Sequence, residues 1–303
     1  MNKENTMSKS VSGYSWTFFG TSRFSVIVLD KLKEKGFIPT LIVTVEDKPK
    51  GRKMILTPPE TKIWATKEGV PYLQLKTLKK PESEEAIRNQ LKEGCEVFVV
   101  ASYGKIIPQN ILDIPRHHCL NVHPSLLPKL RGPSPIKSAI LTLNETGVSI
   151  IRLDAEMDHG PILAQKKVVM EEWPPYEENL EKILGEVGGE MLSELLPLWI
   201  NSKIKEQEQD HSLATICQKI EKSDGQINLE DNPEINLRKI RAYHTWPTTY
   251  FFLTENNIKK RIVVKKAHIE NGKLVLDRII PEGKKEMDYK DFIRNKKDKL
   301  RTI

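Results

Sequence analysis

The opening segment, residues 15–45, constrains the fold of this chain most. A short run of β-forming residues at 15–20 ends in glycine, a helix-like stretch continues to residue 35, and a second apolar strand follows at 37–45. Parallel strands of one sheet need a crossover of this kind between them, so the pattern predicts a parallel sheet. Further strands are expected at 97–102, 119–122 and 148–153, and helices at 61–68, 84–92, 135–143 and 177–199. We therefore predict an α/β domain with a Rossmann-like, mostly parallel sheet.

The composition changes after the last of these helices. Residues 201–211 are polar and charged and lack apolar periodicity, which indicates a linker. After it come a helix candidate at 237–243 and short β-like pieces at 250–253, 261–267 and 273–280, separated by Asn-Asn and Asn-Gly turns. These pieces favour a small β-barrel. We expect a flexible N-terminus over residues 1–13, a first domain over 14–200, the linker over 201–211, and a second domain over 212–303.

Composition limits the functional classes. The N-terminus is polar, and no apolar run approaches the roughly 18 residues that a membrane-spanning helix needs, so a cytoplasmic protein without membrane contact is expected. The cysteines lack C-x-x-C spacing, and the adjacent His117 and His118 would point to opposite faces of a strand, so no disulfide framework or metal site is indicated. Residues 255–303 hold 15 Lys and Arg against 8 Asp and Glu, which accounts for the whole formal charge of +7.

The run from Leu120 to Gly132, LNVHPSLLPKLRG, carries the residues best suited to chemistry. Asn121 and His123 are two residues apart at the end of a predicted strand, so both side chains should project from the same face of the sheet. Pro124 and Pro128 lack the N–H that a central strand needs, so the chain should leave the sheet there as a loop. Ligands of open α/β sheets bind at this carboxyl edge. The absence of G-x-G-x-x-G and of a phosphate-binding glycine motif argues against a dinucleotide site.

A second polar loop, residues 154–160, follows the next predicted strand and should bring Asp158 to the same edge. An Asn amide and a protonated imidazole can both donate to the oxyanion of an acyl transfer, and an Asp can orient the imidazole or move a proton. Each residue also has a purely structural interpretation, with Asn121 as a turn former, His123 as a hydrogen-bonded edge residue and Asp158 as a cap. No serine lies in a nucleophile elbow, which favours direct transfer to a bound acceptor over a covalent intermediate.

The segment 47–62 is longer than an ordinary connection and contains three prolines and five Lys or Arg residues. Long structured loops in compact domains are often functional. Its charge is typical of a solvated loop, and it also suits a finger that grips a polyanion. Both interpretations stay open on the residues alone.

The run NVHPSLLPKLRG, together with MDHGPI at 157–162, resembles the active-site segments of the folate-dependent formyltransferases. The segment 47–62, which contains DKPKGR and LTPPETK, is similar to a loop in the branch of that family that acts on methionyl-tRNA. Residues 238–247 and 281–287 resemble the start and the end of the carboxyl-terminal domain of that branch. The resemblance therefore spans residues 15–295, nearly the whole chain.

This resemblance implies roles for three groups of residues. Asn121, His123 and Asp158 match the catalytic residues. Folate-binding positions are expected at Ser125, Leu126, Leu127, Pro128, Tyr103 and Gly104. A tRNA-binding position is expected at Arg52 from the resemblance, and charge adds Lys48, Lys53, Lys259, Lys260 and Arg261.

The implied reaction moves the formyl group of 10-formyltetrahydrofolate to the α-amine of initiator methionyl-tRNA through a tetrahedral intermediate. Asn121 and His123 would stabilise that intermediate, and Asp158 would handle a proton. The implied protein is a monomer that needs no metal.

Three features depart from the family pattern. His159 stands where threonine is common, and Ser22 stands where proline usually follows Gly-Thr. The stretch formed by residues 261–281 is shorter than the corresponding stretch of the family's second domain. The OB-like barrel of that domain is therefore expected to be shortened.

Other activities remain as alternatives. A formyltransferase acting on an amino-sugar nucleotide shares the Asn-x-His site and a small second domain, but the basic 47–62 segment and basic tail favour tRNA. A phosphoribosylglycinamide formyltransferase would have no use for the second domain. A non-catalytic RNA-binding protein would have no need of the intact catalytic residues.

Overall fold

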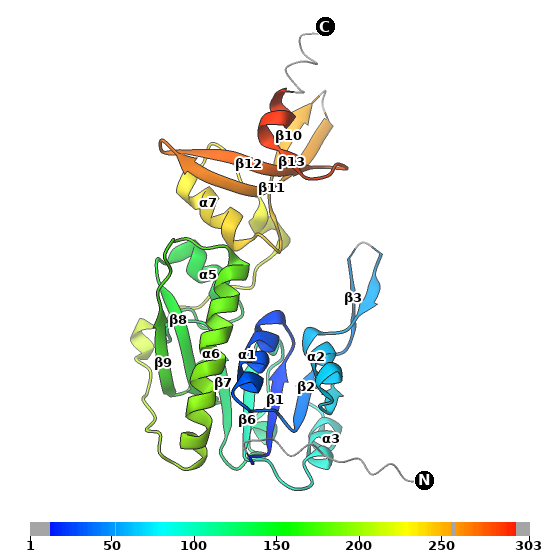
Figure 1. Ribbon diagram of the computed structural model, residues 1–303, viewed down its shortest axis with the longest axis vertical. Coiled ribbons are helices and arrows are strands. Elements are labelled where there is room, and N and C mark those ends of the chain that lie inside the picture. The colour runs from blue at the N-terminus through cyan, green and yellow to red at the C-terminus, as the bar shows by residue number, and fades with distance from the viewer. Residues whose placement is uncertain (1–12, 52, 256–257, 295–303) are drawn as a thin grey trace. The chain divides into compact units, whose positions relative to one another are not determined.

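The computed structural model describes residues 13–51, 53–255 and 258–294. The N-terminus that we predict to be flexible lies, except for its last residue, outside the described residues. The chain forms two compact units (Figure 1), the first from Met1–Pro135, Thr146–Val168 and Glu181–Cys217 and the second from Ile136–Glu145, Val169–Leu180 and Gln218–Ile303. The segment 136–145 belongs to the second unit, in which Arg238 donates hydrogen bonds to Ile140 O (2.8 Å) and Leu143 O (2.7 Å). The predicted domain limits at residues 200 and 212 describe parts of the chain that fold independently of each other. The division into compact units does not test independent folding, so these limits stay a prediction.

The first unit is built on a seven-stranded sheet of order β5-β2-β1-β6-β7-β8-β9. Its strands are β1 (Trp16–Gly20), β2 (Leu41–Thr44), β5 (Tyr72–Gln74), β6 (Val97–Ala101), β7 (Cys119–His123), β8 (Thr146–Arg152) and β9 (Ile162–Val168). The first five in this order pair in parallel, whereas β8 and β9 pair antiparallel. The predicted mostly parallel sheet is thus confirmed.

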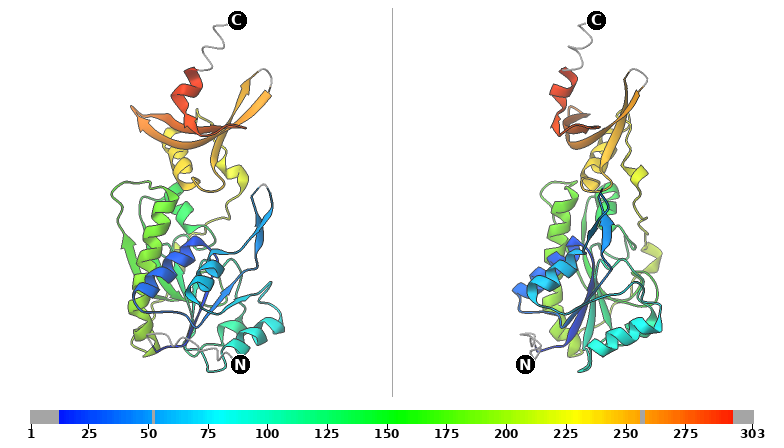
Figure 2. Two further views of the ribbon diagram at one scale, coloured as in Figure 1. Left: turned by 45° about the vertical axis from the view of Figure 1, so that its right-hand side comes forward. Right: turned by 90° about the vertical axis from the view of Figure 1, so that its right-hand side faces the viewer.

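Helices cover both faces of this sheet (Figure 2). The face with α1 (Arg23–Glu34) also carries α2 (Glu60–Glu68) and α6 (Glu177–Ile200), and the other face carries α3 (Pro81–Gln90) and α4 (Gln109–Leu112). Glycines let α6 approach its neighbours closely, because a Cβ added at Gly185 would lie 2.7 Å from Ile27 Cγ2 and one at Gly188 2.6 Å from Val122 Cγ1. All the helices predicted before residue 200 are therefore present, since α5 (Pro135–Thr142) completes the set.

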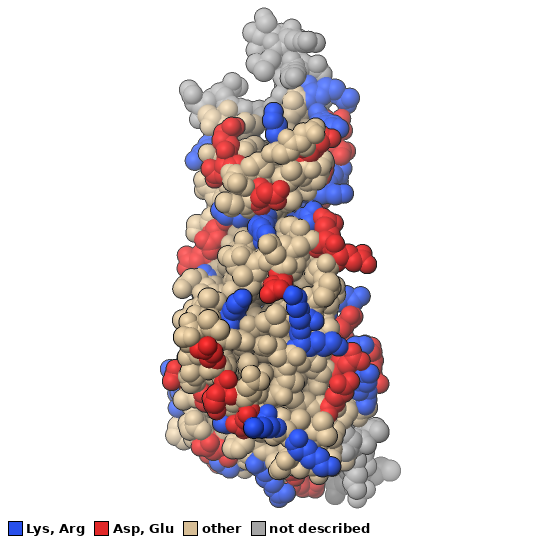
Figure 3. Space-filling view, turned by 90° about the vertical axis from the view of Figure 1, so that its left-hand side faces the viewer, with Lys and Arg blue, Asp and Glu red and all other residues tan. Residues whose placement is uncertain are grey.

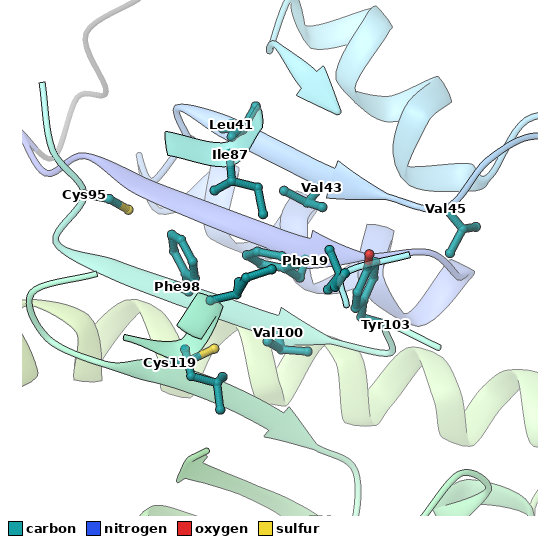
Figure 4. Close-up of a cluster of buried hydrophobic side chains, with 13 residues drawn as sticks. Phe19, Leu41, Val43, Val45, Ile87, Cys95, Phe98, Val100, Tyr103 and Cys119 are labelled. Atoms are coloured by element: carbon teal, nitrogen blue, oxygen red, sulfur yellow. The ribbon is translucent and has the colours of Figure 1, made fainter. Parts of the chain in front are cut away.

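Alternate strand positions build the core beneath α3 (Figure 4). Phe19, Val43 and Phe98 point to this face and pack with Ile87 of α3, and the rings of Phe19 and Phe98 are 5.0 Å apart between centroids. Cys119, the first residue of β7, belongs to the same core. Because side chains alternate along a strand, Asn121 and His123, two and four positions further along β7, project onto this same face.

The second unit packs α7 (Pro233–Ala242) against an antiparallel sheet of order β10-β11-β12-β13. The strands are β10 (Thr249–Glu255), β11 (Ile258–Glu270), β12 (Lys273–Pro281) and β13 (Met287–Asp288). The Asn232 side chain accepts from the first turn of α7, and Pro233 follows it at a position where proline fits a helix start. This sheet corresponds to the predicted shortened barrel. Among the described residues its edge strands β10 and β13 do not pair with each other, so the sheet is open.

The segment 47–62 contains a β-hairpin, formed by β3 (Lys48–Lys50) and β4 (Ile55–Thr57), that projects from the first unit (Figure 1). The sequence does not predict these strands, because almost all their side chains are exposed and no apolar alternation marks them.

Candidate active site

β7 carries the two polar residues on which the site is built. Asn121 and His123 are both buried and face the same side of the sheet, as their spacing predicts. On the neighbouring strand β8, Ile151 is paired with Asn121 and Ser149 with His123. The carboxyl ends of β1, β6 and β7 share one edge because the three strands are parallel.

Asp158 reaches these residues by a route that differs from the expected one. Because β8 runs antiparallel to β7, the 153–161 loop leaves the sheet at the far end and folds back over its face. There Asp158 Oδ1 accepts from Asn121 Nδ2 at 3.2 Å and lies 3.5 Å from His123 Nδ1, while Oδ2 accepts from the N–H of Gly132 at 2.8 Å. The structure therefore brings together the three residues that the sequence singles out.

The partners of His123 define its tautomer. Nε2 lies 2.9 Å from Leu130 O, and a carbonyl oxygen only accepts, so Nε2 carries a proton and donates it. Nδ1 is then the nitrogen that faces Asp158. In the neutral ring Nδ1 can take up a proton, and in the imidazolium it can donate one beside the carboxylate. The arrangement suits proton exchange and oxyanion stabilisation at Nδ1.

The loop after β7 is held by two polar side chains from neighbouring strands. Ser149 Oγ donates to Ser125 O (2.7 Å) and accepts from Leu127 N (3.0 Å). Gln165 Nε2 donates to Leu127 O (2.9 Å). The Ser125 and Leu127 side chains are buried, so they serve the shape of the loop.

The other predicted folate positions differ in how open they are. Leu126 and Pro128 are half-buried, and Gly104 is exposed. Tyr103 is only 7% exposed, with its ring 5.5 Å from that of Phe19, and burial raises the pKa of its hydroxyl to about 12. That hydroxyl has no hydrogen-bond partner within the described part of the chain. A ligand at this edge would meet the backbone of Gly104 more readily than the ring of Tyr103.

The hairpin carries the predicted tRNA positions of the first unit. Lys48 and Lys53 are exposed, and Arg52 lies outside the described residues. At the hairpin's base, Lys62 Nζ donates to both carboxylate oxygens of Asp47 at 2.9 Å, which holds the pKa of Asp47 below its usual range. The base is therefore fixed, while the side chains of Lys48 and Lys53 are exposed to solvent.

The predicted tRNA positions of the second unit lie on β11. Lys259 Nζ stands 4.3 Å from the ring centroid of Phe252, and the guanidinium of Arg261 stands 3.8 Å from that of Tyr250. Lys260 is exposed and, as the residue between them, points to the opposite face. Lys259 and Arg261 thus form one mixed aromatic and cationic surface that Lys260 does not share.

Comparisons with known proteins cover both units. The family described as formyl transferase matches residues 16–196, and the formyl transferase C-terminal domain matches residues 219–274. The methionyl-tRNA formyltransferase of Herpetosiphon aurantiacus is 36% identical over an alignment of 304 residues, gaps included. The alignment covers 93% of this chain and 97% of that protein. The chain belongs to the methionyl-tRNA formyltransferase family. The family member from Chloroflexus aggregans is 41% identical over 238 residues, covering 78% of this chain and 75% of that protein. The chain is therefore a transferase.

A solved structure supports the fold of this family member. A sugar N-formyltransferase from Shewanella superposes with a TM-score of 0.59 at 18% identity, covering 90% of this chain and 99% of that one. At this identity the likeness concerns the fold alone. In the described residues, no helix is long and apolar enough to cross a membrane, and no three His, Cys, Asp or Glu side chains gather as metal ligands.

Sequence reasoning missed the residues that hold the site of this methionyl-tRNA formyltransferase family member in place. Ser149 and Gln165 support the loop after β7, and Arg131 and Gln209 support the loop of Asp158. Arg131 lies in the motif run itself, but nothing in the sequence indicates its partner. Gln209 lies in a polar stretch that predicts exposure, so its burial carries no signal in the sequence.

Proposed function

We propose that this protein transfers the formyl group of 10-formyltetrahydrofolate to the α-amine of methionine esterified to initiator tRNA. The observation that carries the proposal is the end-to-end likeness to a methionyl-tRNA formyltransferase, which extends over both units. The convergence of Asn121, His123 and Asp158 supplies groups that suit the chemistry. The protein would act in the cytoplasm, at translation initiation, without a metal.

The reaction places modest demands on the protein. The α-amine has a pKa of about 7.7 to 8.0, so part of it is neutral and nucleophilic near pH 7. Its nitrogen forms a bond to the formyl carbon, and the carbonyl oxygen takes the negative charge of a tetrahedral intermediate. Collapse breaks the bond between that carbon and the folate N10 nitrogen, while a proton passes from the amine to N10. The protein must hold the reactants in contact and stabilise the charged oxygen.

The three residues divide these tasks. Asn121 Nδ2 uses one of its two N–H groups on Asp158, and the second is the group that we assign to the oxyanion. His123 donates from Nε2 to Leu130 and has Nδ1 for the reacting groups. Asp158 Oδ1 stabilises the imidazolium that forms when Nδ1 holds a proton, so the pair can carry that proton to N10.

The acceptor would be held at two places. Lys48, Arg52 and Lys53 are assigned to the acceptor end of the tRNA. Lys259 and Arg261 are assigned to its phosphates, and Lys260 to a separate phosphate contact on the other face of β11. The donor would lie along the 125–128 loop and the Gly104 backbone.

The proposal is tested by offering the purified protein 10-formyltetrahydrofolate with either initiator methionyl-tRNA or an amino-sugar nucleotide. Formylation of the tRNA alone is expected. His123→Ala should lower kcat for that reaction on the order of a hundredfold, because the variant no longer stabilises the negative charge that develops in the transition state. His117→Ala is the matched control, since His117 pairs with Glu96 away from the site and should keep wild-type kcat.

Four outcomes would contradict the proposal. Formylation of the amino-sugar nucleotide alone would assign the sister activity that the shared fold also permits. RNA binding without turnover would assign a non-catalytic role. Wild-type kcat in His123→Ala would remove the residue from the mechanism. Activity lost on exhaustive chelation and restored only by one divalent ion, while a different ion keeps the tRNA folded, would contradict the metal-free chemistry.

A further inference from the structure

One buried amide holds the loop that presents Asp158. Gln209 Nε2 donates to Asp158 O at 2.9 Å and to Gly160 O at 2.7 Å, and the residue is 5% exposed. These two carbonyls lie on either side of His159, so a single side chain fixes the loop before and after it. Asp158 has a φ of +52°, which residues other than glycine adopt rarely and retain only when their surroundings hold them.

Arg131 fixes which way this amide points. Arg131 Nε and Nη2 donate to Gln209 Oε1 at 3.1 and 2.7 Å, and Nη2 also lies 2.8 Å from His211 Nδ1. An arginine only donates, so the oxygen of Gln209 must face Arg131 and its NH₂ group must face the two carbonyls. Arg131 is itself 9% exposed, so its hydrogen bonds to Gln209 are shielded from competing water, whereas His211 is exposed.

The segment around Gln209 is anchored at both ends. Gln207 N and O exchange hydrogen bonds of 2.9 and 2.7 Å with Ile162. Further along, Arg131 N donates to Thr215 O at 2.9 Å, and Cys217 N donates to Arg131 O at 2.8 Å. Residues 207–217 thus form a strap that joins the loop after β7 to the loop of Asp158. The first five of these residues, 207–211, belong to the segment that the sequence predicts to be a linker.

We propose that Gln209 is a positioning residue for the Asp158 carboxylate, with Arg131 setting its orientation. This inference rests on the proposed function, because it requires Asp158 to take part in formyl transfer. The physical reason is distance: Asp158 Oδ1 must lie close to both Asn121 Nδ2 and His123 Nδ1, and displacements of about 1 Å in a reacting group can cost on the order of a hundredfold in rate.

The test separates the two halves of the amide. Gln209→Glu keeps an oxygen that accepts from Arg131 and removes the N–H groups that hold the two carbonyls. We expect kcat for formyl transfer to fall about 10- to 100-fold, with KM for tRNA and donor changed little. Gln209→Met, which has similar length and no charge, should behave the same way and decides the matter if the glutamate variant does not fold.

Two comparisons make the result specific to Asp158. In an Asp158→Asn background, neither Gln209 substitution should lower kcat further, because the group being positioned is already gone. Gln207→Glu makes the same chemical change on the same strap at an exposed side chain, and it should keep wild-type kcat.

The failures are distinguishable. Wild-type kcat in both Gln209 variants, with Asp158→Asn impaired, would overturn this inference and leave the proposed function standing. Losses that add fully to that of Asp158→Asn would also overturn it, since Gln209 would then act elsewhere. Wild-type kcat in Asp158→Asn itself would overturn the role of the carboxylate and this inference with it.

Discussion

Gly160 shows how little space the loop of Asp158 leaves. A Cβ added at Gly160 would lie 1.9 Å from Arg152 O, which is a backbone atom and cannot rotate away. Gly160→Ala should therefore lower the free energy of unfolding by about 1 to 3 kcal/mol and reduce kcat, because the displaced loop carries Asp158. Thermal unfolding and turnover per folded molecule measure the two effects. Gly104→Ala is the control for stability, since a Cβ there would meet no described atom within 4 Å; equal unfolding temperatures for the two variants would contradict this account.

Glu206, beside the strap, gives the stability a defined dependence on pH. Arg152 Nε and Nη2 donate to its two carboxylate oxygens at 2.8 Å, and this bonding lowers the pKa of Glu206 below its ordinary value. A carboxyl with a depressed folded-state pKa stabilises the protein fully above its unfolded pKa, about 4.3, and loses that contribution as the pH falls through the folded value. Glu206→Gln should lower stability at pH 7 by roughly 0.5 to 1 kcal/mol, since the pair is partly exposed. The difference from wild type should vanish in acid, and a constant difference across the titration would contradict the assignment.

Among the elements, the β3–β4 hairpin is the one that we assign to the acceptor end of the tRNA. Its apolar side chains Met54, Ile55 and Leu56 are exposed, and an exposed apolar cluster among basic residues suits an interaction surface. Replacing residues 48–57 by a short turn should leave folding and donor affinity intact, because the Asp47–Lys62 pair at its base remains. The value of kcat/KM for methionyl-tRNA should fall about 10- to 100-fold, as the methionyl end would be poorly placed. An unchanged kcat/KM for methionyl-tRNA would show that the hairpin is only a solvated loop.

The elements also show what a sequence reveals and what it hides. The sequence predicts β1, β6 and β7 because their residues form apolar or alternating runs. These runs are typical of strands that are buried along their whole length, as these three are. β9 was missed because three consecutive exposed residues interrupt its apolar pattern. Asn121 and His123 could be placed together because strand geometry links residues two apart. Gln209 could not, because its place depends on Arg131, 78 residues earlier in the chain.

At the scale of the whole molecule, charge is distributed unevenly along the sequence. The excess of +7 falls within residues 255–303, yet the face drawn in Figure 3 carries basic and acidic side chains side by side. On that face, a polyanion would meet no continuous field of one sign. In the second unit, Lys259 and Arg261 with Phe252 and Tyr250 provide a local surface in which rings and cations lie together, and we expect tRNA to be recognised there.

Salt dependence distinguishes this local surface from general charge. Replacing Lys259 and Arg261 together by alanine should weaken tRNA binding and lower the slope of log K against log salt by roughly 0.7 to 0.9 for each phosphate that the protein no longer neutralises. Lys284→Ala with Lys285→Ala removes the same charge from exposed positions in the same unit, and it should change the slope much less. Binding titrations over a range of salt concentrations measure each slope. Equal slopes for the two double variants would mean that the second unit attracts tRNA by net charge alone, and the surface of Lys259 and Arg261 would lose its assigned role.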